Sequence, residues 1–329
     1  MKNNFNLGLL ISLSLILISC NNKNQIREEK KEVFSSAHVP EFNPDSAYQY
    51  VEKQVQFGPR VPNTPNHAAC AEYLVQKLES FNAEVSTQEF QAEAFNGKKL
   101  DLTNIIGSFK PENPKRILLA AHWDTRPFAD RDSANPDQPI LGANDGGSGI
   151  GALLEIARIL STDSNYNVGV DIIFFDGEDY GDTAANNKDT WCLGSQYWAK
   201  NKHKPSYAAY YGILLDMVGA KGAEFPKEGF SVRYAREVVN NVWEAGYQLG
   251  YGNYFIDELH GSITDDHRYV NEIAKFPMID IIELHPEKGF GDYWHTHKDD
   301  MSVIDKNTLK AVGQTVLYVL YNEPAPESI

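Results

Sequence analysis

Cysteine is scarce in this sequence. Only Cys20, Cys70 and Cys192 occur among the 329 residues. This excludes a small disulfide-rich scaffold, because at most one bridge can join the two cysteines that follow Cys20. A Cys70–Cys192 bridge and two buried free thiols are equal alternatives at this point.

Basic residues are also under-represented. Lys and Arg number 30 against 45 Asp and Glu, which gives a formal net charge of −15. Nucleic acids and anionic membrane surfaces favour a basic protein face. We therefore expect no nucleic-acid partner.

The sequence has no convincing membrane-spanning run at its N-terminus. Lys2 precedes the apolar residues 7–19, "LGLLISLSLILIS", which are too few for a confident spanning helix. The segment "LISC" resembles a bacterial lipobox, which implies that a signal peptide, residues 1–19, is removed and that Cys20 becomes a lipid anchor. A membrane-anchored lipoprotein of the cell envelope, facing the periplasm or the exterior, is the expectation. A plain signal peptide and an uncleaved anchor are the alternatives.

The remaining chain divides into a tether and a folded part. Residues 20–44 are polar, charged and without apolar periodicity, which predicts a flexible tether. From residue 45 to 329, helical and strand patterns alternate, which predicts a single catalytic α/β domain. We expect a three-layer sandwich in which helices flank a central, largely parallel mixed sheet. The expected helices are 46–58, 66–81, 146–160, 194–201, 231–249 and 306–322, and the expected strands are 83–95, 98–109, 116–124, 170–176, 209–219 and 276–283.

Polar residues follow several of the predicted strands directly. His122 and Asp124 follow "ILLAA", Asp216 follows "YGILL", and four acids follow "IIFF", namely Asp176, Glu178, Asp179 and Asp182. Acids this close repel one another unless protons, hydrogen bonds or a cation compensate. Because ligands bind at the carboxyl ends of strands in open α/β sheets, these residues predict a site at one sheet edge.

The residue types indicate a metal site. With Asp145 in "GANDGGSG" and His295 in "YWHTHKDD", the strand-end residues supply the carboxylates and imidazoles that a divalent ion such as zinc takes as ligands. In the adjacent pair Glu178 and Asp179, one carboxylate can bind the ion while the other moves protons. Each motif has a structural alternative, such as helix capping by Asp145 or a packed aromatic corner at Trp294 and His295.

The order of these motifs resembles the zinc-dependent glutaminyl cyclases and their relatives, the di-zinc aminopeptidases. The motifs are "HWD", "NDGGSGIGALLEIAR", "FFDGEDYG", "LLDMVG", "DDH" and "WHTHKDD", and they span nearly everything after Ser46. The resemblance implies one zinc ion held by Asp145, Asp179 and His295, with Glu178 as general acid and base. The family usually has Glu-Glu where this chain has Glu178-Asp179, so the reach of the shorter Asp179 is in question.

The resemblance leaves two chemistries open. As a glutaminyl cyclase, the chain would convert N-terminal Gln of peptides and proteins to pyroglutamate, with Asp216 and Asp265 of "DDH" supporting Glu178 through a hydrogen-bond relay and Trp191 and Trp294 lining the pocket. Asp265 could instead cap the helix that follows it. As an aminopeptidase, it would bind two metals, with His122 and Asp216 as further ligands. His122 and Asp124 are therefore either second-metal ligands or supports of the first site.

We favour the cyclase, which we expect to be a monomer, over the aminopeptidase. A lipid-tethered binding protein with an inactive site is a minor alternative.

Overall fold

The structure is a computed structural model that describes Met1 and residues 38–184 and 188–326. The predicted signal peptide, the lipidated Cys20 and most of the predicted tether lie outside the described residues. Ordered packing begins slightly before residue 45, because the Phe42 side chain is fully buried in the core. Among the described residues, no helix has the length and apolar character needed to cross a membrane.

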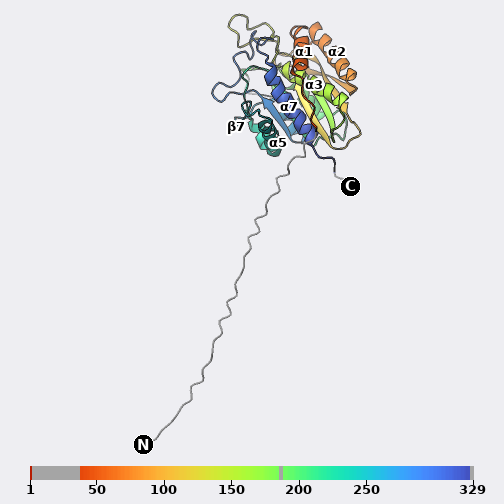
Figure 1. The fold of residues 1–329 in the computed structure, drawn as a ribbon. Coiled ribbons are helices and arrows are strands. Elements are labelled where there is room, and N and C mark those ends of the chain that lie inside the picture. The colour runs from red at the N-terminus through yellow and green to blue at the C-terminus, as the bar shows by residue number, and fades with distance from the viewer. Residues whose placement is uncertain (2–37, 185–187, 327–329) are drawn as a thin grey trace. The chain divides into compact units, whose positions relative to one another are not determined.

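A six-stranded mixed sheet forms the centre of the domain (Figure 1), in the order β1-β2-β4-β3-β5-β8. Strands β4, β3, β5 and β8 are parallel, whereas β2 runs antiparallel to both β1 and β4. The strands are β1 (Glu84–Glu93), β2 (Lys99–Phe109), β3 (Arg116–His122), β4 (Gly169–Phe175), β5 (Tyr211–Asp216) and β8 (Met278–Ile282). The predicted, largely parallel mixed sheet is confirmed.

Alternate side chains of the central strands enter two separate cores. Leu119 and Ile172 face one core, while their neighbours Leu118 and Ile173 face the other. The first core also contains side chains of α1 (Pro44–Val55), α2 (Pro65–Ser80), α3 (Ser148–Thr162), α5 (Gly229–Gln248) and α7 (Lys306–Asn322), and the second contains those of α4 (Leu193–Lys200). Burial on both faces explains why β3, β4 and β5 are continuous apolar runs. The predicted three-layer arrangement is confirmed.

The first helix and the last helix pack together. The backbone N–H of Phe42 donates to Oε1 of Gln314 at 2.8 Å, and Nε2 of Gln314 donates to the carbonyl of Pro40. A Cβ atom added at Gly313 would lie 2.2 Å from the Phe42 ring, so the glycine makes room for that ring. The two ends of the domain are thus joined through one buried aromatic side chain.

Two features were not predicted. A second, two-stranded sheet pairs β6 (Phe225–Lys227) with β7 (Phe255–Leu259), segments too short to show a clear period in the sequence. The predicted helix after Asp265 is only one turn of α-helix, α6 (Asp266–Tyr269), followed by a π-helical turn, η2 (Val270–Ala274). A short 3-10 turn, η1 (Lys188–Thr190), precedes α4.

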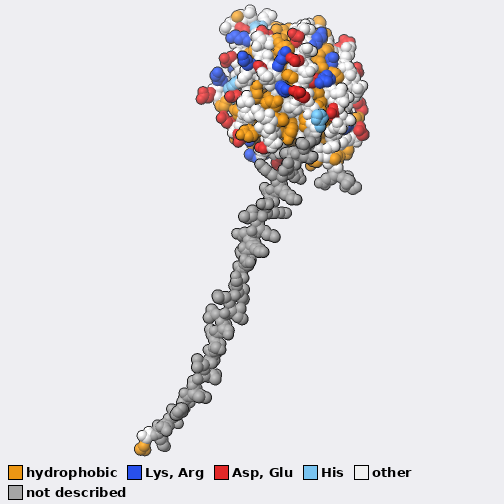
Figure 2. Space-filling view, viewed as in Figure 1, with side chains coloured by type: hydrophobic (Ala, Val, Ile, Leu, Met, Phe, Trp, Pro, Cys, Tyr) orange, Lys and Arg blue, Asp and Glu red, His pale blue; other side chains and the backbone are white. Residues whose placement is uncertain are grey.

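The cysteines are not bridged. Cys70 and Cys192 are both buried and free, which decides between the two alternatives in favour of separate thiols. On the face that carries α1, α3 and α7, basic and acidic side chains are interspersed (Figure 2). The net negative charge is therefore not concentrated in one acidic patch on that face.

Candidate metal centre and active site

The site lies at the carboxyl ends of β3, β4 and β5, where the sequence places it. His122 is the last residue of β3, Glu178 and Asp179 follow β4, and Asp216 ends β5. Asp124 fixes the loop after β4, because its Oδ1 and Oδ2 atoms accept hydrogen bonds from the backbone N–H groups of Glu178 (3.0 Å) and Asp179 (3.2 Å). Asp124 thus supports the site through the backbone of the acid pair, one of the two roles that the sequence left open.

Asp145, Asp179 and His295 form a buried set whose ligand atoms lie within 4.8 Å of one another. Nε2 of His295 is 3.4 Å from Oδ1 of Asp179 and 3.9 Å from Oδ2 of Asp145. Oδ2 of Asp179 is buried and has no hydrogen-bond partner among the described residues. Two carboxylates and one imidazole are a donor set that fits a catalytic zinc ion with an open position. Asp179 reaches this set in spite of its short side chain.

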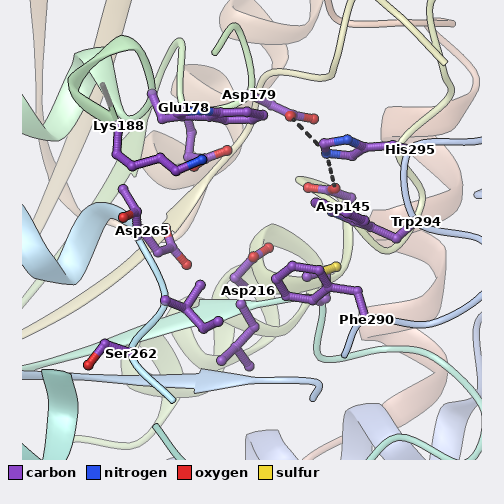
Figure 3. A pocket seen from close by; sticks show the side chains of 15 residues that line it. Asp145, Glu178, Asp179, Lys188, Asp216, Ser262, Asp265, Phe290, Trp294 and His295 are labelled. Carbon is purple, nitrogen blue, oxygen red and sulfur yellow. Dashed lines mark ion pairs between the residues drawn. The ribbon is translucent and has the colours of Figure 1, made fainter. Parts of the chain in front are cut away.

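The His295 ring is held from behind. Its Nδ1 atom lies 3.1 Å from Oδ1 of Asp130, which leaves Nε2 directed at Asp145 and Asp179 (Figure 3). Arg126 donates to both oxygens of Asp130 and to the backbone carbonyl of Asp179. A carboxylate on the far nitrogen of a metal-binding histidine fixes its tautomer and orientation.

Three non-glycine residues around the site have left-handed backbone conformations. They are Cys192 (φ 58°), Met217 (φ 48°) and His295 (φ 57°). Such conformations are costly for residues other than glycine and collect where the surrounding structure imposes them. Cys192 follows Trp191, Met217 follows Asp216, and His295 is itself one of the three predicted zinc ligands.

A second candidate set consists of His122, Asp145 and Asp216. Nε2 of His122 lies 3.1 Å from Oδ1 of Asp145 and 3.2 Å from Oδ1 of Asp216, so the imidazole bridges the two carboxylates. Burial lowers the pKa of His122, but hydrogen bonds with Asp124, Asp145 and Asp216 raise it well above its ordinary value. His122 therefore lies between the two carboxylates that, with its own Nε2 atom, could hold a second ion.

Glu178 belongs to a group of buried acids whose pKa values are raised. Burial raises the pKa of Glu178 well above its usual value, and the charges of Asp265 and Asp179 raise it further against the lowering effect of His122. Burial likewise raises the pKa of Asp216 to about 7, with Asp265 contributing and His122 opposing. The predicted hydrogen-bond relay is not seen, since no direct hydrogen bond joins Asp265 to Glu178 or Asp216 in the described residues. The three acids interact through charge.

Asp265 caps the helix that follows it, which is one of the two functions that the sequence offered, and it also lines the pocket. Its Oδ1 atom accepts a hydrogen bond from the N–H of Asp266 and caps α6. Among the residues that the structure describes, its buried Oδ2 atom has no hydrogen-bond partner, and the residue lines the pocket.

These groups surround a pocket of about 290 Å³ (Figure 3). Its apolar wall includes Trp294, whose ring stacks on His295 with centroids 3.7 Å apart, and Phe290, which packs on Trp294 at 4.3 Å. Trp191 lies parallel to the His295 ring at 6.0 Å. The other lining residues are Asp145, Glu178, Asp179, Lys188, Asp216, Met217, Ser262, Ile263, Thr264, Asp265 and Ile282.

Some acids and histidines of the quoted motifs lie apart from the site. Asp176 pairs with Nε2 of His67 at 2.9 Å and accepts a hydrogen bond from Thr103. Asp182 caps a turn through the N–H of Ala184. His297 pairs with Asp132 near the surface. The four-acid cluster is thus divided, and only Glu178 and Asp179 enter the site.

Sequence reasoning missed several supporting residues. Asp299 accepts hydrogen bonds from the backbone N–H groups of Asn144 (2.7 Å) and Asp145 (3.0 Å), and Sγ of Cys192 donates to Oε1 of Glu178 at 3.2 Å. The Arg126–Asp130 ion pair was missed as well. Its one signal in the sequence is that the two residues lie four positions apart. Contacts of Asp299 and Cys192 join distant segments, which a single sequence does not reveal.

The sheet, the strand-end loops and the buried acid and histidine sets define the class of α/β metalloenzymes. Residues 104–320 match peptidase family M28, and the chain belongs to this family. The glutaminyl cyclase of Bacteroides thetaiotaomicron, solved with N-acetylhistamine, is 55% identical with a TM-score of 0.85, covering 87% of this chain and 100% of that chain.

Two further relatives carry different descriptions. A Zn-dependent exopeptidase from Parabacteroides distasonis is 56% identical, also with a TM-score of 0.85 and the same coverage. The glutaminyl-peptide cyclotransferase of Dictyostelium discoideum is 26% identical over 297 residues, 78% of each chain. The resemblance predicted from the motifs is confirmed, as is a zinc-dependent enzyme.

Proposed function

We propose that the chain is a glutaminyl-peptide cyclotransferase that uses one zinc ion at Asp145, Asp179 and His295. The observation that carries this proposal is the His122 bridge between Asp145 and Asp216. Nε2 of His122 thereby has carboxylate partners without a metal ion, whereas Oδ2 of Asp179 is buried without a hydrogen-bond partner among the described residues. The similarity to solved glutaminyl cyclases supports the same conclusion.

The pocket suits an N-terminal glutamine that folds back on its own amine. Its volume of about 290 Å³ fits a single residue, with Trp294 and Phe290 on one side and the acids on the other. Asp216 and Asp265 face the position of the α-amine and would bind it. The reaction is intramolecular, so the pocket contributes by holding the amine against the amide carbon instead of leaving the side chain free to rotate.

Glu178 moves the proton in this scheme. When bound, zinc would polarise the γ-carboxamide of the substrate. Glu178 takes a proton from the α-amine as its nitrogen bonds to the amide carbon, and then gives the proton to the departing ammonia. Cys192 and the backbone contacts of Asp124 hold the Glu178 carboxylate in place.

The test offers the purified full chain a peptide with N-terminal Gln and a leucine arylamide. Loss of ammonia from an otherwise intact peptide, seen by mass spectrometry, supports cyclisation. A shortened peptide or release of the arylamine instead supports the alternative, a two-metal aminopeptidase. The similarity to the Zn-dependent exopeptidase of Parabacteroides distasonis is the observation that keeps this alternative.

We further propose a monomeric enzyme anchored in the cell envelope through lipidated Cys20. The apolar run before "LISC" supports this. Metabolic labelling with a fatty acid checks it, because Cys20→Ser should abolish the label.

A further inference from the structure

A groove adjoins the pocket on the side of the loop before Asp265. It has a volume of about 800 Å³ and lies between the first turns of α5 and the segment that follows β7. Ser262 lines both the pocket and the groove, and the neighbouring Gly261 and Gly229 line the groove. The two cavities therefore adjoin at Ser262, which Figure 3 places on the same side of the pocket as Asp265.

The charge of the groove is opposite to that of the whole chain. Its charged or titratable lining residues are Arg233, Arg236, His260 and Glu237. Arg233 and Arg236 are exposed, and neither makes an ion pair within 4 Å among the described residues; the Arg233 guanidinium lies over the Tyr234 ring, 5.2 Å from its centroid. In a chain of net charge −15, two unpaired guanidinium groups beside an acidic pocket are a local reversal of sign. Exposed positive charges attract and orient negatively charged ligands.

The groove cannot recognise a peptide by adding a strand to the sheet. It extends to Pro277, next to β8, the edge strand. The Asn271 side chain accepts a hydrogen bond from the N–H of Met278 and donates one to its carbonyl. The Ser231 hydroxyl oxygen accepts a hydrogen bond from the N–H of Asp280. Because these backbone groups are already satisfied, recognition in the groove depends on side chains and their charges.

We infer that the groove binds the acidic side chains of a peptide substrate downstream of its second residue. This inference rests on the proposed function, because a peptide whose first residue fills the pocket has to leave it across its rim, and Ser262 leads into the groove. Arg233 and Arg236 then meet acidic groups from about the third residue onward. The exposed side chain of Leu259, which is 71% accessible, supplies an apolar contact beside them.

The experiment compares peptides that all begin with Gln-Ala and differ in the residues that follow. Gln-Ala-Glu-Glu-Glu, Gln-Ala-Ser-Ser-Ser and Gln-Ala-Lys-Lys-Lys are offered to the full chain, with Gln-Ala amide as a substrate too short for the groove. We expect kcat/KM to be about 5-fold higher for the acidic than for the neutral peptide, because exposed ion pairs contribute up to about 1 kcal/mol each. The preference should shrink at high salt, where exposed charges are screened.

The double variant Arg233→Gln/Arg236→Gln should lose the preference and keep its rate on Gln-Ala amide. The matched control is Lys53→Gln/Lys77→Gln, which removes the same charge from α1 and α2 and should keep the preference. The groove assignment would be overturned by equal rates for all three peptides or by a preference that survives in the double variant. An equal loss of the preference in the control variant would also overturn it. A dimer that only the double variant abolishes would assign the groove to a second copy of the chain and also overturn it.

Binding separates this proposal from the proposed function. Fluorescence anisotropy with labelled forms of the same peptides reports the groove without requiring turnover. If no Gln peptide loses ammonia, the proposed function fails. The groove assignment then stands or falls on whether the acidic peptide binds more tightly than the basic one in the wild type and not in the double variant.

Discussion

At the scale of single residues, the site assigns different tasks to two neighbouring acids. Asp179 points to His295 and Asp145, whereas Glu178 accepts a hydrogen bond from Cys192 and lies close to Asp265. The direction of each side chain follows from the two backbone hydrogen bonds to Asp124, which fix the loop after β4. Metal binding and proton transfer are therefore separable by mutation.

Glu178→Gln should lower kcat by about 10²- to 10⁴-fold with zinc still bound, because glutamine keeps the size of the side chain but cannot accept the proton. Asp179→Asn should instead release zinc. Zinc content and turnover, measured on both variants, check this division. Zinc loss from the first variant together with zinc retention in the second would reverse the two roles.

His203 makes the stability of the fold depend on pH. Burial lowers its pKa to about 4, and its Nδ1 atom accepts a hydrogen bond from Trp198. Between pH 6.5 and about 4 the unfolded chain takes up a proton on this histidine and the folded chain does not, so its contribution makes stability fall as pH falls through that window. His203→Asn keeps an acceptor for Trp198 and should weaken the pH dependence of Tm. If the Tm of the variant fell between pH 7 and 4.5 as steeply as that of the wild type, this assignment would be contradicted.

The sequence could identify the residues that carry chemistry but not those that hold them. Asp145, Glu178, Asp179, Asp216 and His295 stand at strand ends or in distinctive motifs, and the structure brings them together. Their supports are different. Asp130, Cys192 and Asp299 act through contacts between segments far apart in the chain, and only the folded structure creates those contacts.

At the scale of elements, α3 sits unusually close to the sheet. A Cβ atom added at Gly149 would lie 2.2 Å from the carbonyl oxygen of Leu215 and 2.9 Å from Cβ of Ala121. The glycine thus lets the first turn of α3 contact β3 and β5 near His122 and Asp216. The helix position and the site geometry depend on the same close approach.

Gly149→Ala should destabilise the fold by about 1–3 kcal/mol, the usual cost of overpacking a core. Urea unfolding monitored by circular dichroism measures it. Gly261→Ala is the control, because an added Cβ there meets no atom within 4 Å. Equal stability of the two variants would show that α3 can shift at no cost.

Long elements were predictable and short ones were not. The continuous apolar runs of β3, β4 and β5 and the periodic pattern of α7 have clear signals, and their bounds agree to within a few residues. Strand β6, by contrast, has three residues, and helix α5 separates it along the chain from its partner β7. Its existence depends on tertiary packing rather than on local periodicity.

At the scale of the whole molecule, metal binding and folding are coupled. The buried carboxylates of Asp145 and Asp179 repel each other, and burial raises the pKa of Asp179 with Asp145 adding to the rise. A cation between them removes this repulsion. Ligand binding to the folded state alone stabilises it in proportion to the logarithm of the ligand concentration.

Removal of zinc by a chelator should therefore abolish activity and lower Tm, and added zinc should restore both. At a zinc concentration a thousand times its Kd, the stabilisation is about 4 kcal/mol. Differential scanning calorimetry and metal analysis by mass spectrometry are the measurements. Full activity in protein verified to be free of metal would contradict the zinc assignment.

The contact of Phe42 with Gly313 and Gln314 bears on how the protein is made. The hydrogen bond between Phe42 and Gln314 spans 272 residues, almost the entire domain. A nascent chain exposes Phe42 early, but α7, which covers it, leaves the ribosome after the other helices and strands of the domain. Contacts of such long range slow folding, because the intervening chain has to be ordered first. The domain therefore completes its folding only after α7 has been synthesised, and a message truncated before α7 yields a chain with an uncovered aromatic side chain and an open core.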